Sequence, residues 1–437
     1  MCSIYLFMKP VLQVALDFMN LKRALRIAKE SVEGGVDWIE AGTPLIKAEG
    51  LNSVRKLREL FPEKKIVADM KTMDVGRIEV EMAAKAGADI VIVMGITDDS
   101  TIREAVDAGK NYGAEIMVDL MSVENMEKRA KELERMGVDY ICVHVSIDQQ
   151  MRGMNLIEEL KKISIAVNIP VAIAGGLNSE TAADAVNSGA TIVIVGGAIT
   201  KAEDARKSTE RIKKAMRTGK PVNSKLYKKY VDPSEVFQKV STANISDAMH
   251  RSGFLEGIMP RSGVETGTRM VGRAVTVRTY PGDWAKPVEA IDIAKEGEVI
   301  VIDCGGTGDA VWGELASQSC LMKRISGVVI NGSVRDIEDI ERIGFPVYSK
   351  SVKSVAGEPK GLGEINIPIK ISGNLIRPGD YIIGDMDGVV VVPKEKAIEI
   401  ANRAMDVLEK ENRIRGEIKR GSTLSKVTEL RRWEKKL

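Results

Sequence analysis

Charged side chains follow a buried run directly in the stretch "IVADMKTMD", residues 66–74. Residues 66–68 are typical of a buried strand, and Asp69, Lys71 and Asp74 come after them. Alternate side chains of an extended strand share a face, so Asp69 and Lys71 should point the same way. Unlike charges at the rim of a core cost desolvation free energy unless they pair or something binds there. Taken alone, the stretch fits either a structural ion pair or a binding site.

Polar residues also end other apolar runs in the first half of the chain. Asp17 ends the run at 11–17, Glu40 lies in "WIEAG", and His144 lies in "YICVHV". Carboxylates brought together repel, and a hard divalent cation such as Mg²⁺ would neutralise them. A lone strand histidine is usually structural, but one placed beside a lysine and a metal ion suits an acid or base role. We therefore favour acid–base chemistry for His144.

Two pairs of glycines end the apolar runs "IPVAIAGG" and "ATIVIVGG". These pairs are Gly175–Gly176 and Gly196–Gly197. Backbone amides exposed at such turns could bind a phosphate group. The two pairs are therefore candidate phosphate or substrate contacts.

A repeat explains how these residues come together. The segments "EGGVDWIEAG", "KAGADIVIVMG", "RMGVDYICVHV" and "NSGATIVIVGG" are alike, and their glycines Gly35, Gly87, Gly137 and Gly189 are spaced 52, 50 and 52 residues apart. Four more apolar runs lie between them, which predicts eight strands separated by helices, with a strand-plus-helix unit of about 25 residues. Such continuous apolar runs suit a parallel sheet covered on both faces. The prediction is a (β/α)8 TIM barrel with its site at the carboxyl ends of the strands, and a doubly wound open sheet is the alternative.

The pattern of helical and β-type runs changes after the predicted barrel. We assign residues 1–216 to the barrel, the polar, turn-rich segment 217–228 to a linker, residues 229–420 to a second α/β domain with a mixed sheet, and residues 421–437 to a basic tail. Short β-type runs such as "DYIIGDMDGVVVVP" dominate the second domain, and no eightfold repeat is visible there.

Composition limits the class of protein. A chain of 437 residues is long enough for two or three domains, and 44% of its residues are hydrophobic. Its 64 basic and 62 acidic side chains nearly balance, which argues against a nucleic-acid-binding protein. The start of the chain is apolar but broken by Lys9, Pro10 and Asp17, and it shows neither a basic leader nor a membrane-spanning run. The four scattered cysteines predict reduced thiols, so we expect a cytoplasmic protein with no membrane partner.

The motif "DMKTMD" resembles the Asp-x-Lys-x-x-Asp signature of the orotidine-monophosphate decarboxylase superfamily, over roughly residues 10–216. Orotidine decarboxylases usually carry lysine in place of Glu40 and arginine in place of Gly197. Keto-gulonate-phosphate decarboxylases share the Glu but tend to have arginines after the strand 6 histidine and in the last turn. The stretches "IEAGTPLIKAEG", "VHVSIDQQ" and "VGGAI" instead look like the 3-hexulose-6-phosphate synthases, except that Ser146 stands where that family often has glycine.

This resemblance implies a reversible aldol reaction that joins ribulose 5-phosphate and formaldehyde to give arabino-hex-3-ulose 6-phosphate. It implies Mg²⁺, with Mn²⁺ as a substitute, held by Glu40 and Asp69. His144 would move the proton at C1, and Lys71 would add positive charge beside the oxyanion, while Asp74 and Asp17 orient it and the sugar hydroxyls. The resemblance also implies a homo-oligomer in which a neighbour's loop completes the site. The rival reaction is decarboxylation of a 3-keto-sugar-acid phosphate.

A second group of charged residues lies in the later domain. Twenty residues separate Glu314 in "VWGELASQSC" from Arg335 in "GVVINGSVRDIEDI", and Asp336 follows Arg335. Glu314 should open a helix just after Gly313, and the backbone amides at the N-terminus of that helix could bind an anion. Arg335 is suited to binding a carboxylate. A structural pair between the helix-start Glu and the Arg is the alternative.

The segment from "STANISDAMHRSG" to "GFPVYSKS" resembles the family named for a regulator of ribonuclease activity, over most of residues 229–415. That family includes metal-dependent aldolases for 4-hydroxy-2-oxo acids such as 4-hydroxy-4-methyl-2-oxoglutarate, and it implies a swivelling β/β/α fold. By this resemblance Asp336 would bind a metal ion, while Arg335 and the amides around Gly313 would hold a 2-oxo acid; Glu314 replaces the family's first Asp. The alternative is a non-catalytic module that regulates a ribonuclease or drives oligomerisation.

Overall fold

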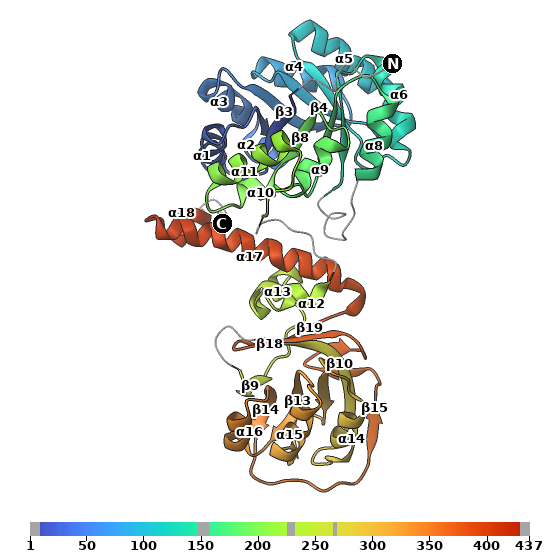
Figure 1. Cartoon of the computed structure of the whole chain (residues 1–437), viewed down its shortest axis with the longest axis vertical. Helices are drawn as coiled ribbons and strands as arrows, with labels where there is room; N and C mark the ends of the chain where they lie inside the picture. Colours follow the sequence, from blue (N-terminus) through green and yellow to red (C-terminus); the bar gives the residue numbers. More distant parts are fainter. Residues whose placement is uncertain (1–8, 147–156, 225–231, 265–268, 429–437) are drawn as a thin grey trace, which may run out of the picture. The chain divides into compact units, whose positions relative to one another are not determined.

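The computed structural model describes residues 9–146, 157–224, 232–264 and 269–428 (Figure 1). The chain divides into two compact units. The first combines Met1–Lys229 with Glu409–Leu437, and the second is Tyr230–Leu408.

The division between the units falls inside the long helix α17 (Ala397–Lys419). The sequence predicts a second domain that runs to residue 420, whereas the structure groups residues from Glu409 onward with the first unit. Parts of the predicted linker and of the predicted basic tail lie outside the described residues.

Eight parallel strands close into a barrel in the first unit, in the order in which they follow one another in the chain. β1 pairs with β2 on one side and with β8 on the other, which closes the ring. The predicted TIM barrel is therefore confirmed, and the open-sheet alternative is excluded. The strands are β1 (Val11–Leu16), β2 (Trp38–Ala41), β3 (Lys65–Thr72), β4 (Ile90–Met94), β5 (Glu115–Asp119), β6 (Tyr140–His144), β7 (Val171–Ala174) and β8 (Ile192–Val195).

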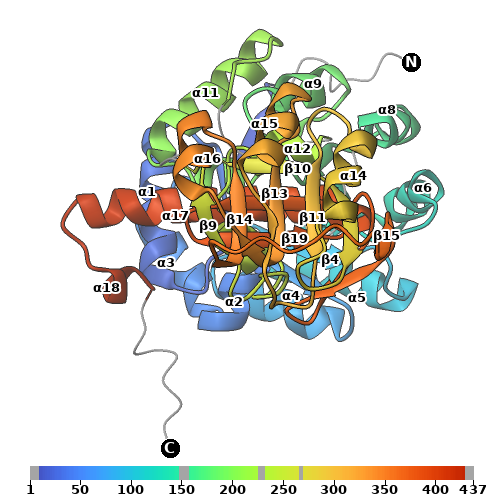
Figure 2. The same cartoon turned by 90° about the horizontal axis from the view of Figure 1, so that it is seen from below.

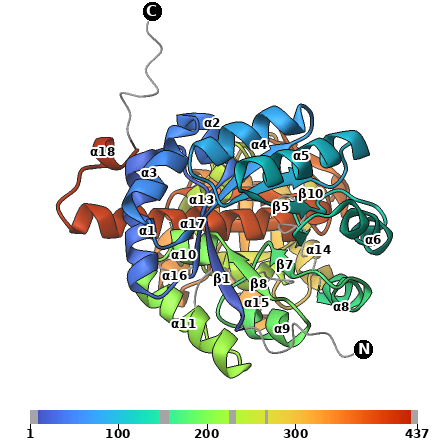
Figure 3. The same cartoon turned by 90° about the horizontal axis from the view of Figure 1, so that it is seen from above.

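Helices surround the barrel (Figure 3). Those described are α1 (Leu21–Glu33), α2 (Thr43–Glu49), α3 (Asn52–Leu60), α4 (Gly76–Lys85), α5 (Asp99–Tyr112), α6 (Met126–Met136), α8 (Ile157–Ala166), α9 (Thr181–Asn187), α10 (Gly197–Thr200) and α11 (Ala205–Thr218). The last turns of α17 and the short α18 (Leu424–Thr428) belong to the same unit.

The four repeated glycines follow helices at the points where the chain turns into β2, β4, β6 and β8. Gly35, Gly87, Gly137 and Gly189 have φ angles of 92°, 104°, 87° and 102°, a left-handed backbone that glycine adopts without a steric cost. The repeat read from the sequence thus corresponds to one turn that recurs before every second strand.

Alternation along β1 explains how polar groups reach the barrel interior. Leu12, Val14 and Leu16 pack in the layer between strands and helices. Gln13 and Ala15 take the alternate positions, and Ala15 packs in the barrel's central cluster. The interior positions at the carboxyl ends of the strands are thus free to carry polar side chains.

A mixed sheet forms the centre of the second unit, as predicted. The path β19-β18-β10-β11-β13-β14-β9 is parallel from β10 to β14 and antiparallel at both ends. The strands are β9 (Met259–Ser262), β10 (Met270–Thr279), β11 (Val299–Asp303), β12 (Ala310–Trp312), β13 (Gly327–Val334), β14 (Val347–Val352), β15 (Gly363–Ile365), β16 (Ile369–Ile371), β17 (Asn374–Ile376), β18 (Tyr381–Asp385) and β19 (Gly388–Val392).

Two groups of helices cover this sheet. One group packs against β10, β11 and β13 (Figure 2): α14 (Ala285–Ile293), α15 (Glu314–Met322) and α16 (Ile337–Ile343). The other packs against β18 and β19: α12 (Pro233–Phe237), α13 (Thr242–Ala248) and the start of α17, which follows the 3₁₀ turn η2 (Lys394–Lys396). Among the described helices, none is both long and apolar enough to cross a membrane.

Candidate active site

A pocket of about 520 Å³ opens at the carboxyl ends of the barrel strands. Six strands and the turns that follow them supply its predicted residues. Those that line it are Asp17, Glu40, Asp69, Lys71, His144, Gly175, Gly176, Gly196 and Gly197. The barrel therefore brings together residues that lie up to 180 positions apart in the chain.

Three carboxyl groups share the wall formed by the first strands. Burial raises the pKa of Glu40 well above its usual range, and the charges of Asp69 and Asp17 raise it further. Burial and the charge of Asp69 also raise the pKa of Asp17. These raised pKa values show that the fold holds acidic groups close together at a cost in stability, which is a mark of functional sites.

Gln13 lies beneath Glu40 in the barrel interior. Its Nε2 donates to Oε2 of Glu40 at 2.5 Å, and this hydrogen bond lowers the pKa of Glu40 against the larger effect of burial. Both side chains are buried. Gln13 therefore orients the carboxylate from below and partly offsets its desolvation.

The end of β3 carries Asp69 and Lys71 through an irregular backbone. The register against β4 shifts between Ala68 and Thr72, and Lys71 has a φ of 48°, a left-handed conformation that is uncommon for lysine. Nζ of Lys71 lies 3.0 Å from Oδ2 of Asp69. Thr43 donates to the same Oδ2 at 2.7 Å, so the carboxylate is held from two sides.

Asp119, at the end of β5, joins the lysine to the histidine. Its Oδ2 lies 3.3 Å from Nζ of Lys71 and 2.6 Å from Nδ1 of His144. Burial alone would raise the pKa of Asp119, but the charge and hydrogen bond of His144 and the charge of Lys71 lower it below the usual value. Because a carboxylate only accepts, Nδ1 of His144 donates, and Nε2 is the ring nitrogen left for the substrate.

Sequence reasoning missed Asp119, Gln13 and Thr43. Asp119 could have been found, because "EIMVD" ends in an acidic residue at the same position as the runs that end in Asp17 and Asp69. A glutamine within the apolar run "VLQVAL" gives no such signal, and the contact of Thr43 depends on the turn before α2.

Asp74 lies apart from these groups in the single chain. Its side chain is exposed and does not line the pocket, and its Oδ1 accepts from the backbone N–H of Val75 at 2.7 Å. Its neighbours Met73 and Val75 are 53% and 51% exposed. The site within one chain is therefore built without Asp74.

The acidic wall has the chemistry of a divalent-cation site. Glu40 and Asp69 offer carboxylate oxygens, the donors that Mg²⁺ and Mn²⁺ prefer, and their mutual repulsion would fall on binding a cation. Among the described residues, no group of three or more His, Cys, Asp or Glu side chains is arranged to hold a metal ion. These two carboxylates fit a site in which the remaining ligands come from substrate or solvent.

The second predicted group also comes together, at the surface of the second unit. Oδ2 of Asp336 lies 3.5 Å from Nε of Arg335 and accepts from the backbone N–H of Glu314 at 3.2 Å. A Cβ on Gly313 would lie 2.4 Å from that oxygen, so any other residue there would displace the Asp336 carboxylate from this position. As predicted, Glu314 opens a helix (α15) and Arg335 follows a strand (β13).

Comparisons with known proteins agree with this division of the chain. A family model described as orotidine 5'-phosphate decarboxylase / HUMPS family matches residues 10–212. The 3-hexulose-6-phosphate synthase of Bacillus subtilis (strain 168) is 44% identical over 209 residues, which are 48% of this chain and 99% of that protein. The chain belongs to the orotidine 5'-phosphate decarboxylase / HUMPS family.

Solved structures resemble this family's barrel as well. The 3-hexulose-6-phosphate synthase from Salmonella typhimurium is 36% identical with a TM-score of 0.47, covering 48% of this chain and 99% of its own. The 3-keto-L-gulonate-6-phosphate decarboxylase from Vibrio cholerae is 29% identical with a TM-score of 0.45, covering 49% of this chain and 100% of its own. The sequence relatives support a carbon–carbon lyase activity, of the aldehyde-lyase class, for this member of the family.

The second unit of this family member matches a different model. The model, described as Aldolase/RraA, covers residues 242–391. The resemblance read from the sequence is thus confirmed for both halves of the chain.

Proposed function

We propose that the barrel catalyses the reversible aldol condensation of ribulose 5-phosphate with formaldehyde to arabino-hex-3-ulose 6-phosphate. The observation that carries the proposal is the arrangement of Asp119 between Lys71 and His144, in one pocket with Glu40 and Asp69. Similarity to 3-hexulose-6-phosphate synthases supports the substrate class.

Proton transfer at C1 of the ketose would fall to His144. Its Nε2 takes a proton from C1, while Asp119 holds Nδ1 and stabilises the imidazolium that forms. The enediolate carbon then attacks the carbonyl carbon of formaldehyde, and the imidazolium returns its proton to the new hydroxyl oxygen. The cleavage direction reverses the same steps, so the balance of atoms and protons closes in both directions.

Negative charge that develops on the ketose oxygens needs positive charge nearby. A divalent cation, Mg²⁺ or Mn²⁺, held by Glu40 and Asp69 would supply part of it. Lys71 supplies the rest: burial lowers its pKa, but the charges of Asp69 and Asp119 outweigh that effect and raise it, so the ammonium stays charged. Asp17, on the same wall, would orient the sugar hydroxyls.

The phosphate end of the substrate would lie at the two glycine turns. Gly175 and Gly176 follow β7 with left-handed φ angles of 107° and 72°, and both line the pocket. Gly196 and Gly197 line the same pocket after β8, the strand that pairs with β7. Backbone amides at late barrel turns are common phosphate ligands.

One assay on the full chain separates this reaction from its rival. Formaldehyde consumption that depends on ribulose 5-phosphate and on Mg²⁺ is the expected result. Release of CO₂ from a 3-keto-gulonate 6-phosphate, with no formaldehyde consumption, would instead make the barrel a decarboxylase. The sequence favours the first, because it has Gly197 where those decarboxylases tend to have arginine.

For the second unit we propose a metal-dependent lyase that acts on a 4-hydroxy-2-oxo acid. The cluster of Gly313, Glu314, Arg335 and Asp336 supports it, because Arg335 suits the oxo-acid carboxylate and Asp336 a divalent cation. Pyruvate release by the full chain, lost in Arg335→Lys and in Asp336→Asn, is the expected result. Tight binding to a ribonuclease with no pyruvate release from any oxo acid would make the unit a regulatory module.

We also propose that the chain forms a homo-oligomer through the surface around Asp74. Met73, Val75, Ile78 and Met82 are large apolar side chains, each about half exposed, on the turn before α4 and on α4 itself. A second copy covering them would bring Asp74 to an interface. Sedimentation should show a dimer or larger species that Ile78→Asp dissociates with loss of turnover. A fully active monomer would contradict this.

The cysteines support a reducing compartment. Cys142, Cys304 and Cys320 are free and buried, and burial raises the pKa of the Cys142 thiol well above its usual range. We therefore propose a cytoplasmic location, which is also the expectation from the sequence.

A further inference from the structure

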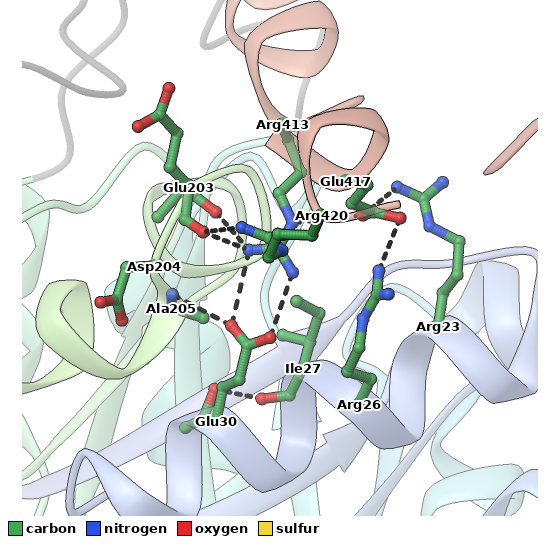
Figure 4. Close-up of polar contacts among 12 residues, drawn as sticks. Arg23, Arg26, Ile27, Glu30, Glu203, Asp204, Ala205, Arg413, Glu417 and Arg420 are labelled. Atoms are coloured by element: carbon green, nitrogen blue, oxygen red, sulfur yellow. Dashed lines mark hydrogen bonds and ion pairs between the residues drawn. The ribbon is translucent and has the colours of Figure 1, made fainter. Parts of the chain in front are cut away.

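A buried arginine from the far end of the chain contacts the barrel just after its last strand. Arg413, in α17, has a side chain that is only 3% exposed. Its Nη1 donates to the backbone carbonyls of Ala202 at 2.7 Å and Glu203 at 2.9 Å, and its Nη2 lies 3.2 Å from Oε1 of Glu30 (Figure 4). A buried guanidinium is tolerated only when its donors find acceptors, so this contact is specific.

A second buried charge completes the contact. Glu417, one turn along α17, is 4% exposed and accepts from Nε of Arg413 at 3.2 Å. It also pairs with Arg23 at 3.3 Å and Arg26 at 2.6 Å, both on α1. Burial would raise the pKa of Glu417, but the hydrogen bond from Arg26 and the three arginine charges lower it. The end of α17 is thus fixed to α1 by charges on both sides.

The carbonyls that Arg413 holds belong to the connection between α10 and α11. α10 begins at Gly197, which lines the pocket, and ends at Thr200, two residues before Ala202. Glu30 accepts from the backbone N–H of Ala205 at 3.2 Å, so it holds the start of α11 as well as Arg413. A displacement of Arg413 would therefore displace the turn at Gly196–Gly197, because only a few residues separate that turn from Ala202.

The similar synthases form their barrels without this segment. The Bacillus subtilis protein is matched over 99% of its length by 209 residues of this chain, and the family model ends at residue 212. No room remains in that protein for a counterpart of residues 409–428. The contact is thus an addition to the barrel rather than a part of it that the family shares.

We propose that Arg413 is a positioning residue for the phosphate end of the barrel substrate. By holding the carbonyls of Ala202 and Glu203, it sets the position of the turn at Gly196–Gly197. The inference rests on the proposed function, because it assumes that this turn binds the phosphate. It makes the end of the chain a working part of the barrel site.

The test compares two arginines of the same helix in the full chain. Arg413→Met removes the contact, and Arg415→Met is the matched control, because Arg415 is half exposed and pairs with Glu411 on its own helix at 2.7 Å. We expect Arg413→Met to raise KM for ribulose 5-phosphate about tenfold, since small displacements of a binding group have effects of this order or larger. KM for formaldehyde and kcat should stay within about twofold of the wild type, because only the phosphate end is displaced.

Binding of inorganic phosphate, measured by calorimetry, separates this inference from the proposed reaction. If the wild type shows no aldol turnover, the proposed reaction fails, but weaker phosphate binding by Arg413→Met than by Arg415→Met still supports the positioning role. Equal phosphate affinity and equal KM in both variants would overturn it, as would a wild type that binds no phosphate. If Arg413→Met does not fold, Arg413→Lys replaces it in the test. Lysine keeps the positive charge but cannot reach Glu30 and both carbonyls together. A folded Arg413→Lys with the wild-type KM for ribulose 5-phosphate would equally overturn the positioning role of Arg413.

Discussion

The two candidate sites differ in how far the fold encloses their charged groups. In the barrel, the side chains of Asp69 and Asp119 are 7% and 2% exposed, and Lys71 lies between them. In the second unit, Arg335 and Asp336 are 44% and 37% exposed. Charges removed from water interact more strongly, and they are also more expensive to leave without partners.

The buried barrel side chains are therefore held in place before substrate binds, whereas the exposed side chains of Arg335 and Asp336 are held less firmly. Three of the four carboxylates that line the barrel pocket are each held by a specific donor: Gln13 for Glu40, Thr43 for Asp69, and His144 for Asp119. In the second unit, Asp336 accepts a hydrogen bond from the backbone N–H of Glu314 and pairs with the exposed Arg335. We therefore expect substitutions in the barrel to have large effects on turnover, and those in the second unit to leave the barrel reaction unchanged.

The largest effect should come from Glu40→Gln, which removes one of the two proposed metal ligands. We expect kcat for the formaldehyde reaction to fall by roughly 10⁴-fold, because charge stabilisation at the ketose oxygens is lost. The same variant should be more stable in the absence of cations, with Tm higher by about 2–4 °C. Thermal unfolding in chelator-treated buffer measures this second change.

The sign of that stability change follows from the raised pKa of Glu40. An acid whose pKa is higher in the folded state destabilises the fold as pH rises from its unfolded value of 4.5 through its folded value. Wild-type Tm should therefore fall over this range by more than that of Glu40→Gln. If Tm changed with pH in the same way in the wild type and in Glu40→Gln, the pKa of Glu40 would not be raised in the folded protein.

The next largest effect should come from Asp119→Asn. Asparagine keeps the shape but no longer stabilises the imidazolium or fixes the tautomer of His144, so kcat should fall on the order of 10³-fold. Glu115→Gln is the matched control, because Glu115 lies at the other end of the same strand, where it pairs with Lys65. Loss of activity in both variants would point to damage to the strand rather than to the site.

A smaller effect should follow from Gln13→Leu. The hydrogen bond from Gln13 lowers the pKa of Glu40, so removing it raises that pKa and moves the acidic limb of the profile of kcat/KM to higher pH. At a pH on this limb we expect about tenfold lower kcat/KM, and near-wild-type values at higher pH. An unchanged limb would mean that Glu40 does not have to be ionised for turnover.

The smallest effect should come from Asp336→Asn. Because this exposed residue is not part of the barrel site, we expect the formaldehyde reaction to stay within about twofold of the wild type. Pyruvate release, if it is found in the wild type, should be lost in the same sample. A large loss of barrel turnover would show that the two sites are not independent.

Most of the barrel could be predicted because its signals are local and repeated. Glycines before every second strand and acidic residues at strand ends place Asp17, Glu40 and Asp69 on one rim once eight strands are assumed. Arg335 and Asp336 could be placed at a strand end in the same way.

Features that depend on distant contacts or irregular backbone could not be predicted. The left-handed conformation of Lys71 is uncommon for lysine, so the residue type does not predict it. The motif predicts Asp74 in the site, but its side chain is exposed after β3 and does not line the pocket of the single chain. The contact between Arg413 and Glu30 spans 383 positions, and no pattern along the chain signals it.

Turnover of Asp69→Ala gives the most direct test of the central claim that acidic groups at the early strand ends hold a divalent cation beside a sugar-phosphate enediolate. Wild type and variant are treated with chelator, returned to Mg²⁺, and assayed for formaldehyde consumption with ribulose 5-phosphate, while circular dichroism monitors the fold. We expect Mg²⁺ to restore the wild type and to leave the folded variant inactive. A folded variant with Mg²⁺-dependent turnover like that of the wild type would contradict the account.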